Sequence, residues 1–328
     1  MKTVILGGGA LGSIIGAHLH RAGNEVVIVA REPRASLLER EGVRITGLQE
    51  FVARVPVVRD PAQAGEADLY INALKTFQSA DVLPRLRARP GAMAFSVQNG
   101  VYKNTELAAV LGAEAVLGAM AMISGEVLPD GAVRFTMNDS LQVGEQGGGA
   151  SERSRAVAEM LEKSGVRTTA SSQIRSVEWS KYAIFVPSFC LAVITRQETH
   201  RFLQHEGTAR VTVALAREMA QLAKAEGIEL IASGPFSAAA LARVGFDEAV
   251  GMARAFGDLL AANAPRHKVS ALQDLEKGRR TEVDEIVGHA LRLADGLGLD
   301  LPTLRTCHGL CSGISAGVAG LPAAAAAA

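Results

Sequence analysis

The chain has 328 residues, which is enough for two domains that each bury a core of their own. Hydrophobic residues make up 48% of it and charged residues 21%, which is typical of a soluble globular protein. The 34 basic side chains balance the 34 acidic ones, so the composition shows no basic excess of the kind a nucleic-acid-binding surface usually needs. Aromatic residues are sparse, and the abundant Ala and Gly favour close-packed helices over a sheet-rich sandwich.

The N-terminal stretch 1–19 is apolar with one early lysine, so a signal peptide has to be weighed. Three successive glycines interrupt it where the apolar region of a signal peptide should be continuous, and no clean small-residue cleavage site follows. His18 and His20 then interrupt any span long enough for a membrane helix. We therefore expect a mature, folded N-terminus, a cytoplasmic location and no membrane partner.

The first elements form a recognisable unit. A short β-rich run at 3–6 is followed by glycines, a helical stretch at 11–22 and a second apolar run at 25–30, which together predict a βαβ unit. Further apolar runs predict more buried strands, at 67–74, 92–97 and 115–117. Because helical segments lie between several of these runs, we expect an α/β fold whose N-terminal part is a Rossmann-type, doubly wound parallel sheet.

The pattern changes near residue 172, where the apolar segments take helical lengths and β-rich runs become few. Helices are predicted over 174–195, 207–226, 237–243, 247–261, 281–297 and 303–314. We place the domain boundary at Ala170 to Ser172, which gives a Rossmann domain at 1–171 and an all-α domain at 172–328. The alanine run Ala323–Ala328 is low-complexity and is expected to fray.

A glycine motif lies between the first predicted strand and helix. Gly7, Gly9 and Gly12 form G-x-G-x-x-G, in which the first glycine allows a tight turn, the second lets a pyrophosphate approach the backbone and the third permits close helix–strand packing. The following helix N-terminus offers unpaired N–H groups and the positive end of a dipole. The motif alone is weak, but its setting predicts a dinucleotide site formed by Gly7, Gly8, Gly9, Ala10, Leu11 and Gly12.

The end of the second predicted strand indicates which dinucleotide binds. An acidic residue there would bind the ribose 2′-hydroxyl of NAD, whereas an arginine accommodates the 2′-phosphate of NADP. Here the strand leads directly into Arg31, and Glu32 follows it. Although Glu32 weakens the distinction and Arg31 could be an ordinary surface charge, the position favours NADP(H) as the cofactor.

The chain has three cysteines, Cys190, Cys307 and Cys311. This small and odd number argues against a disulfide framework. Cys307, His308 and Cys311 are close in sequence, but a zinc site needs about four ligands and no second cluster is visible. We therefore expect no metal site.

Several local sequences occur in an order that resembles the ketopantoate reductase (2-dehydropantoate 2-reductase) family over almost the whole chain. The most specific is VSALQDLEKGRRTEVDEIVG at 269–288, and the others are VILGGGALGS at 4–13, Arg31, ALKTFQ at 73–78, QNG at 98–100, EWSKY at 178–182 and GLDLPT at 298–303. The resemblance implies NADPH-dependent reduction of a 2-oxo acid to a D-2-hydroxy acid, a step of pantothenate biosynthesis. It also implies a small-molecule substrate, allows a homodimer and leaves the oligomeric state open.

By the same resemblance, Lys75 and Asn99 contact the cofactor, Lys181 is the catalytic lysine, Ser270 holds the substrate carboxylate and Glu282 lies beside the substrate. The chemistry agrees, since an ammonium can stabilise the charge that forms on a reduced ketone oxygen and deliver the proton. From the residues alone, both charged groups could equally be exposed, and Glu282 could simply favour the start of a helix.

The chain departs from the family pattern at the substrate side. Members specific for ketopantoate carry asparagines four and eight residues after the lysine, where this chain has Phe185 and Phe189, and a further family asparagine falls near Thr199. Steps of four lie on one side of a helix, so both rings either face the substrate or belong to the core. Pro187 should kink or interrupt this helix. The expected substrate is therefore either ketopantoate or a bulkier, more apolar 2-oxo acid.

Two other functions have to be weighed. Rossmann proteins with helical second domains include reductases of other carbonyls and of imines, but the 269–288 stretch argues against that class. A non-catalytic NADPH sensor would need neither Lys181 nor Glu282, and the chain has both.

Overall fold

The computed structural model describes residues 1–319, so the alanine run Ala323–Ala328 lies outside the described residues. The chain forms two compact units, Met1–Glu178 and a second that begins at Trp179. Helix α6 (Ile174–Thr195) starts in the first unit and continues into the second. The loop 171–173, between β10 (Thr168–Ala170) and α6, is the boundary we propose between the two domains.

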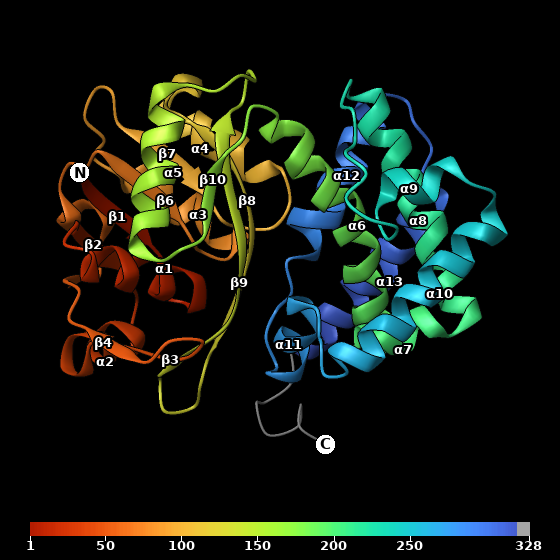
Figure 1. Ribbon diagram of the computed structural model, residues 1–328, viewed down its shortest axis with the longest axis horizontal. Helices are drawn as coiled ribbons and strands as arrows, with labels where there is room; N and C mark the ends of the chain where they lie inside the picture. The colour runs from red at the N-terminus through yellow and green to blue at the C-terminus, as the bar shows by residue number, and fades with distance from the viewer. Residues whose placement is uncertain (320–328) are drawn as a thin grey trace. The chain divides into compact units, whose positions relative to one another are not determined.

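The first unit contains the predicted parallel sheet (Figure 1). Its strands run in the order β5 (Val57–Val58), β2 (Glu25–Val29), β1 (Lys2–Leu6), β6 (Leu69–Asn72) and β7 (Met93–Ser96), all parallel. The chain moves outward from β1 in one direction and then returns to continue from β6 in the other. The strand order therefore reverses between β1 and β6, which is where a doubly wound sheet binds its ligand. The predicted α/β Rossmann-type fold is confirmed.

Side chains of β1 alternate between two apolar layers, because successive residues of a strand point to opposite faces. Ile5 packs in the layer that contains Ile14 and Ile15 of α1 (Ala10–Arg21), whereas Val4 and Leu6 face a smaller layer on the opposite side. This second layer includes residues of the helix α4 (Tyr102–Leu111). The sheet is therefore covered on both faces, as parallel sheets require.

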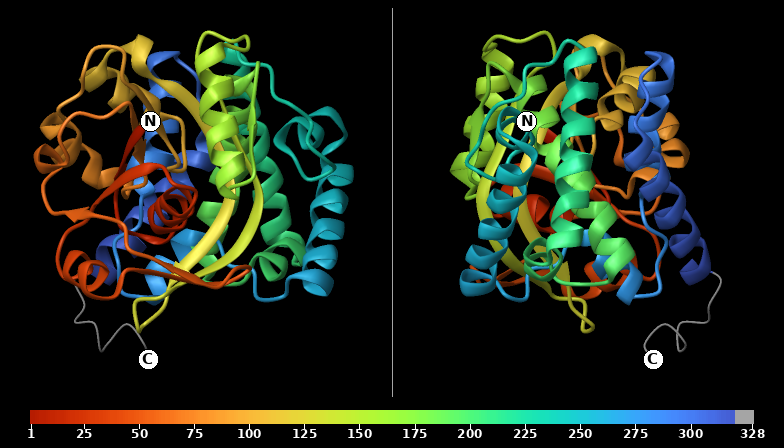
Figure 2. Two further views of the ribbon diagram at one scale, coloured as in Figure 1. Left: turned by 60° about the vertical axis from the view of Figure 1, so that its left-hand side comes forward. Right: turned by 90° about the vertical axis from the view of Figure 1, so that its right-hand side faces the viewer.

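A second, mixed sheet was not predicted. Its strands are β10, β9 (Val133–Glu145), β3 (Val43–Gly47) and β4 (Phe51–Ala53) in that order, and β8 (Leu117–Val127) pairs antiparallel with β9. Figure 2 shows β8 and β9 as two long curved strands. The predicted strand at 115–117 reaches only the first residue of β8, since its later residues include Ala, Gly and Met, which have weak strand propensity. In β9, the alternation of buried Val133 and Phe135 with exposed Arg134 and Thr136 was a usable signal.

The remaining helices of the first unit connect these strands. They are α2 (Arg34–Glu41), the short α3 (Ser79–Val82) and α5 (Glu152–Ser164). Short 3₁₀ turns lie at Pro61–Ala64, Thr76–Gln78, Leu83–Arg85 and Ala113–Ala115. The helix α5 begins with a capping box, in which the Ser151 hydroxyl accepts from the Ser154 N–H and the Ser154 hydroxyl lies against the Ser151 N–H.

Among the described residues of the second unit, the helices and strands assigned are all helices, as predicted. After α6 follow α7 (Thr199–Gln204), α8 (Glu206–Ala225), α9 (Ala238–Arg243), α10 (Phe246–Asn263), α11 (Ser270–Glu276), α12 (Val283–Gly296) and α13 (Pro302–Ala319). The predicted helices agree with these closely, except that α13 ends later than expected. The two short helices α7 and α11 were not predicted, because six or seven residues show little helical periodicity.

Helix α6 is long and apolar. Pro187 lies inside it without ending it, so the expectation of an interruption was wrong. Ser188 Oγ donates to the Ile184 carbonyl at 3.0 Å in the same turn. By length and composition this helix could cross a membrane, but 67% of its most apolar window is buried within the structure, as is usual for a core helix. Among the described residues, no other helix is long and apolar enough.

Candidate active site

The glycine loop joins β1 to α1 at the strand-order reversal. Gly7 has a φ of +109°, and a Cβ added to it would lie 2.8 Å from the Ala73 carbonyl oxygen. A Cβ at Gly12 would lie 2.0 Å from the Gly7 carbonyl oxygen. A Cβ at Gly9, by contrast, would meet no protein atom within 4 Å. Gly7 and Gly12 are thus required by the fold, whereas Gly9 leaves its backbone open to an approaching ligand.

The first turn of α1 is suited to bind phosphate. Gly9 is its N-cap, no side chain caps the helix and no acidic residue lies in the first turn. The N–H groups of Ala10 and Leu11 at this end therefore have no capping side chain as an acceptor, and the helix dipole adds positive potential. This helix end has the features of a pyrophosphate-binding site, and the dinucleotide site formed by residues 7–12 stays a prediction.

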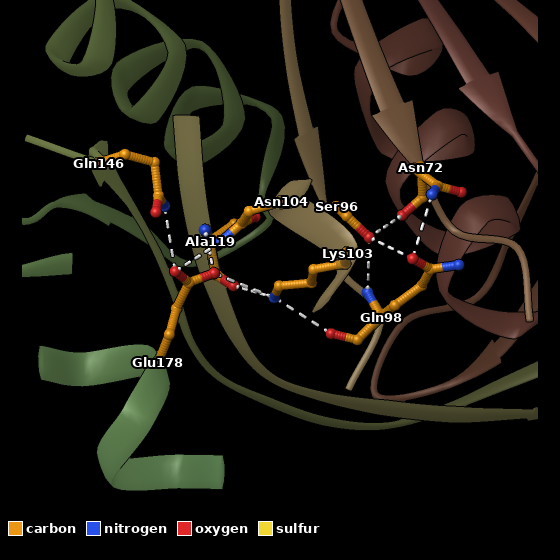
Figure 3. Close-up of polar contacts among 8 residues, drawn as sticks. All are labelled: Asn72, Ser96, Gln98, Lys103, Asn104, Ala119, Gln146 and Glu178. Carbon is orange, nitrogen blue, oxygen red and sulfur yellow. Dashed lines mark hydrogen bonds and ion pairs between the residues drawn. The ribbon is translucent and has the colours of Figure 1, made fainter. Parts of the chain in front are cut away.

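A buried polar network fixes the ends of β6 and β7 (Figure 3). Asn72 Nδ2 and Ser96 Oγ both donate to Gln98 Oε1, at 3.1 and 2.9 Å. Gln98 Nε2 in turn donates to the Leu74 carbonyl at 3.0 Å. Lys75 comes directly after Leu74 in the chain and Asn99 directly after Gln98, and both are half-buried. The network therefore sets the backbone of both predicted cofactor residues.

Arg31 is exposed directly after β2, at the same sheet edge as the glycine loop. Its neighbour Glu32 is engaged by other groups: Ser36 Oγ donates to it at 2.9 Å and Arg59 Nε at 2.6 Å. These contacts lower the pKa of Glu32. Arg59 follows β5 and also binds Glu39 at 2.7 Å. Glu32 weakened the prediction of NADP(H) from the sequence. Its charge is already paired with Arg59 within the protein.

Lys181 lies on α6 and is half-buried. The next residue, Tyr182, is 2% exposed, and its hydroxyl donates to the Ile286 carbonyl of α12 at 2.6 Å. Burial raises the pKa of Tyr182, so the phenol is neutral and acts as a donor. Glu282, 7% exposed, is the N-cap of α12, one turn before Ile286. One hydrogen bond thus links the two helices that carry Lys181 and Glu282.

The segment before Glu282 is held by α13. The Thr281 N–H and hydroxyl both contact Ser315 Oγ, at 3.1 and 3.0 Å, and both residues are buried. Ser270 is the first residue of α11 and is half-buried. The preceding loop is tied to α7, because the Thr199 N–H donates to the His267 carbonyl and Thr199 Oγ1 contacts His267 Nδ1 at 2.9 Å. Thr199 thus supports the segment that carries Ser270.

The two phenylalanines of α6 differ in exposure. Phe185 is half-buried, whereas Phe189 is only 1% exposed. Their rings meet edge to face with centroids 6.2 Å apart. Phe189 is therefore a core residue in this structure, and Phe185 packs on it with part of its surface accessible.

The cysteine region of α13 shows no metal site. Cys307 and Cys311 are buried, and His308 Nε2 lies 3.3 Å from a carboxylate oxygen of Asp284. In the described part of the chain, no group of three or more His, Cys, Asp or Glu side chains could hold a metal ion.

Sequence reasoning missed several residues that position the candidate site. They are Asn72, Arg59, Lys103, Glu178 and Tyr182. Glu178 and Tyr182 stand inside the quoted EWSKY segment, and Lys103 lies three residues after QNG, so their proximity to the motifs was a signal. No signal in the sequence indicated Arg59, because it is the order of strands in the sheet that brings the end of β5 beside the end of β2.

The first unit is a Rossmann unit with a glycine loop suited to phosphate. A helical unit with a lysine and a buried carboxylate follows it. This combination is typical of a pyridine-nucleotide-dependent oxidoreductase. The family model described as "Ketopantoate reductase PanE/ApbA" matches residues 3–148, and the model of the family's C-terminal part matches residues 173–315. The chain therefore belongs to the ketopantoate reductase family.

Individual relatives agree along their full length. A 2-dehydropantoate 2-reductase of Archaeoglobus fulgidus is 28% identical over 318 residues, which cover 97% of this chain and 99% of the relative. A ketopantoate reductase family structure from Ralstonia eutropha JMP134 superimposes with a TM-score of 0.82 at 26% identity, covering 97% and 100% of the two chains. A D-mandelate dehydrogenase structure with NADH and anilino(oxo)acetate superimposes with a TM-score of 0.83 at 20% identity. The match covers 97% of this chain and 100% of that chain, so the two share the fold.

The predicted family and enzyme class are confirmed by these matches. The chain is an oxidoreductase that acts on a CH–OH group, and its family uses a pyridine nucleotide and a small 2-oxo acid.

Proposed function

We propose that this enzyme reduces a 2-oxo acid to a D-2-hydroxy acid with NADPH, and that it does so in the cytoplasm. The observation that carries the proposal is the placement of Lys181 and Glu282 within the second unit. Both lie on helices that the Tyr182–Ile286 hydrogen bond joins, and neither is fully exposed. A lysine and a carboxylate held in this way can serve a carbonyl reduction, whereas a protein that only senses cofactor needs neither.

The preference for NADPH rests on the end of β2. The exposed Arg31 guanidinium can pair with a 2′-phosphate by charge-assisted hydrogen bonds. The Glu32 carboxylate would otherwise repel that phosphate or accept from the 2′-hydroxyl of NADH, but it is bound by Ser36 and Arg59. The Arg31 guanidinium is therefore the cationic group that we assign to the cofactor 2′-phosphate.

Each proposed residue has a defined role in the reaction. The glycine loop and the α1 N-terminus would hold the pyrophosphate, while Lys75 and Asn99 would contact the cofactor from the ends of β6 and β7. The bound NADPH supplies a hydride. The Lys181 ammonium stabilises the negative charge that develops on the ketone oxygen and gives that oxygen its proton. Ser270 would hold the substrate carboxylate, and Glu282 would orient the substrate beside the lysine.

The substrate we propose is bulkier and more apolar than ketopantoate. Phe185 stands where ketopantoate-specific members have an asparagine, and part of its ring is accessible. Burying the hydroxyl of ketopantoate against a ring, without a partner, costs about 1–3 kcal/mol. An apolar or aromatic side chain would instead gain roughly 25 cal/mol per Å² buried.

Product analysis tests the proposal. The enzyme is incubated with NADPH and either ketopantoate or an aromatic 2-oxo acid, and the product is separated on a chiral column. We expect the D-2-hydroxy acid and an equal amount of oxidised cofactor. An L-product, or no product from any 2-oxo acid, would contradict the proposed function.

A further inference from the structure

A lysine and a glutamate of the first unit form an ion pair that is almost completely buried (Figure 3). Lys103, on α4, is 3% exposed and Glu178, on α6, is 5% exposed. Lys103 Nζ lies 3.2 Å from Glu178 Oε1. Removing two charges from water costs several kcal/mol per ion, and a well-packed apolar pair would often be at least as stable. A contribution to stability is therefore a weak explanation for this pair, and its contacts suggest a better one.

On the lysine side, the ammonium binds the loop that carries a proposed cofactor residue. Lys103 Nζ donates to the Gln98 carbonyl at 3.1 Å and to the Ala119 carbonyl of β8. Gln98 is also the centre of the polar network that joins β6 to β7. Asn99 is the next residue, and Gly100 follows with a φ of +83°. The backbone on the N-terminal side of Asn99 is thus fixed by both the carbonyl and the side chain of Gln98.

On the glutamate side, the carboxylate binds four groups of the first unit. Glu178 Oε1 accepts from the Ala119 N–H at 3.0 Å, besides its ion pair with Lys103. Glu178 Oε2 accepts from Asn104 Nδ2 at 2.9 Å and from Gln146 Nε2 at 3.1 Å. Both carboxylate oxygens therefore have two partners each, which satisfies the buried charge.

The strand beside this cluster leaves room for it. A Cβ at Gly118 would lie 2.2 Å from Gln146 Nε2 and 2.9 Å from Glu178 Oε2, so only glycine lets the two side chains approach β8 this closely. Burial lowers the pKa of Lys103, and the Glu178 charge opposes that shift, so the charge of the lysine depends on its partner.

Glu178 lies near the start of the helix that carries the proposed catalytic lysine. It is the last residue of the first unit, and Lys181 follows three residues later on the same helix, within one turn. We propose that the Lys103–Glu178 pair is a positioning device, which anchors the start of α6 to the Gln98–Gly100 loop and so sets Lys181 for proton delivery. This inference rests on the proposed function, because it assigns to Glu178 an effect that passes through Lys181.

A double-mutant cycle tests the inference. Glu178→Gln, Lys181→Ala and the double variant are prepared in the full chain, and kcat is measured with NADPH and the best 2-oxo acid. We expect Glu178→Gln to lower kcat by about 10²-fold, the effect of a small misplacement of a reacting group. In the Lys181→Ala background the same change should have almost no further effect, because residues that act as a unit are non-additive.

Glu218→Gln is the matched control. Glu218 is also a buried glutamate, and its two oxygens accept from the Thr303 and Leu304 N–H groups at the start of α13. Its change should lower the melting temperature and leave kcat within about twofold, because caps contribute to stability and not to the reaction. If Glu178→Gln does not fold, Gln146→Ala removes one contact to Glu178 and should lower kcat by a smaller factor, again only when Lys181 is present.

The outcomes are distinct. If Lys181→Ala turns over normally, the proposed function fails and the inference fails with it. If Lys181→Ala is impaired but Glu178→Gln or Gln146→Ala is not, only the inference is overturned. It is also overturned if the losses multiply in the double variant, because the pair would then act on the structure independently of Lys181. The non-additive result supports it.

Discussion

Lys181 bears the main chemical demand of the proposed reaction, since it has to stabilise an oxyanion and protonate it. Lys181→Ala should lower kcat by about 10²–10⁴, the range for a positioned proton donor. The dissociation constant of NADPH should be almost unchanged, because the phosphate-binding loop belongs to the first unit. Lys163→Ala is a control, since Lys163 is 73% exposed and pairs with the exposed Glu159. Normal turnover of Lys181→Ala, measured by loss of nicotinamide absorbance, would remove this lysine from the mechanism.

Arg31 and Arg59 should together set the cofactor preference. Arg31→Ala should weaken NADPH binding by about 1.5–3 kcal/mol, the value of a hydrogen bond to a charged group, and barely change NADH binding. Arg59→Ala should release the Glu32 carboxylate, which would weaken NADPH binding and strengthen NADH binding. Calorimetric titration with both cofactors measures the effects, with Arg40→Ala as an exposed control. Equal affinity of the unmodified enzyme for NADPH and NADH would contradict this account.

The two phenylalanines of α6 allow the substrate proposal to be tested separately from the core. Phe185→Asn should raise the kcat/KM of ketopantoate relative to an aromatic 2-oxo acid by about tenfold, since a partner for a buried hydroxyl is worth at least 1 kcal/mol. Phe189→Leu should lower the melting temperature and leave the preference unchanged, because Phe189 is 1% exposed. A preference that follows Phe189 and not Phe185 would show that the assignment is reversed.

At the scale of elements, the loop between β1 and α1 separates folding from binding. Gly9→Ala should fold normally, because its Cβ would meet no protein atom, but should weaken NADPH binding by about 1.5–3 kcal/mol through the loss of a phosphate contact. Gly12→Ala should destabilise the protein by about 1–3 kcal/mol, because its Cβ would lie 2.0 Å from the Gly7 carbonyl oxygen. Thermal melts and cofactor titrations of both variants measure this. Unchanged affinity in a folded Gly9→Ala would mean that the phosphate does not approach there.

Helices and strands whose apolar residues recur at a regular spacing were predictable from the sequence, and elements without such spacing were not. The β1–α1–β2 unit and the long helices of the second unit follow from apolar runs and helical spacing, because burial alone specifies them. The second sheet was missed, since β8 contains Ala, Gly and Met where strand-forming residues were expected. Pro187 was expected to kink or interrupt α6, and the helix continues through it from Ile174 to Thr195.

At the scale of the whole molecule, the motifs indicated the residues for which we propose chemical roles, but not which residues contact one another. Gly7, Arg31 and Asn99 are at strand ends because a parallel sheet gathers its carboxyl ends at one edge. The Lys103–Glu178 pair joins residues 75 positions apart, and Arg59 reaches Glu32 only because β5 neighbours β2. Pairings of this kind depend on the tertiary fold, and one sequence without its fold gives no sign of them.

The central claim, an NADPH-dependent reductase of a bulky 2-oxo acid, is tested most directly by kcat/KM for a panel of 2-oxo acids. The panel should include ketopantoate, branched aliphatic acids and aromatic acids, each with NADPH and with NADH. The account predicts the highest kcat/KM for an apolar or aromatic acid with NADPH, and a lower value for ketopantoate. A clear preference for ketopantoate over every bulkier acid, or equal rates with both cofactors, would contradict it.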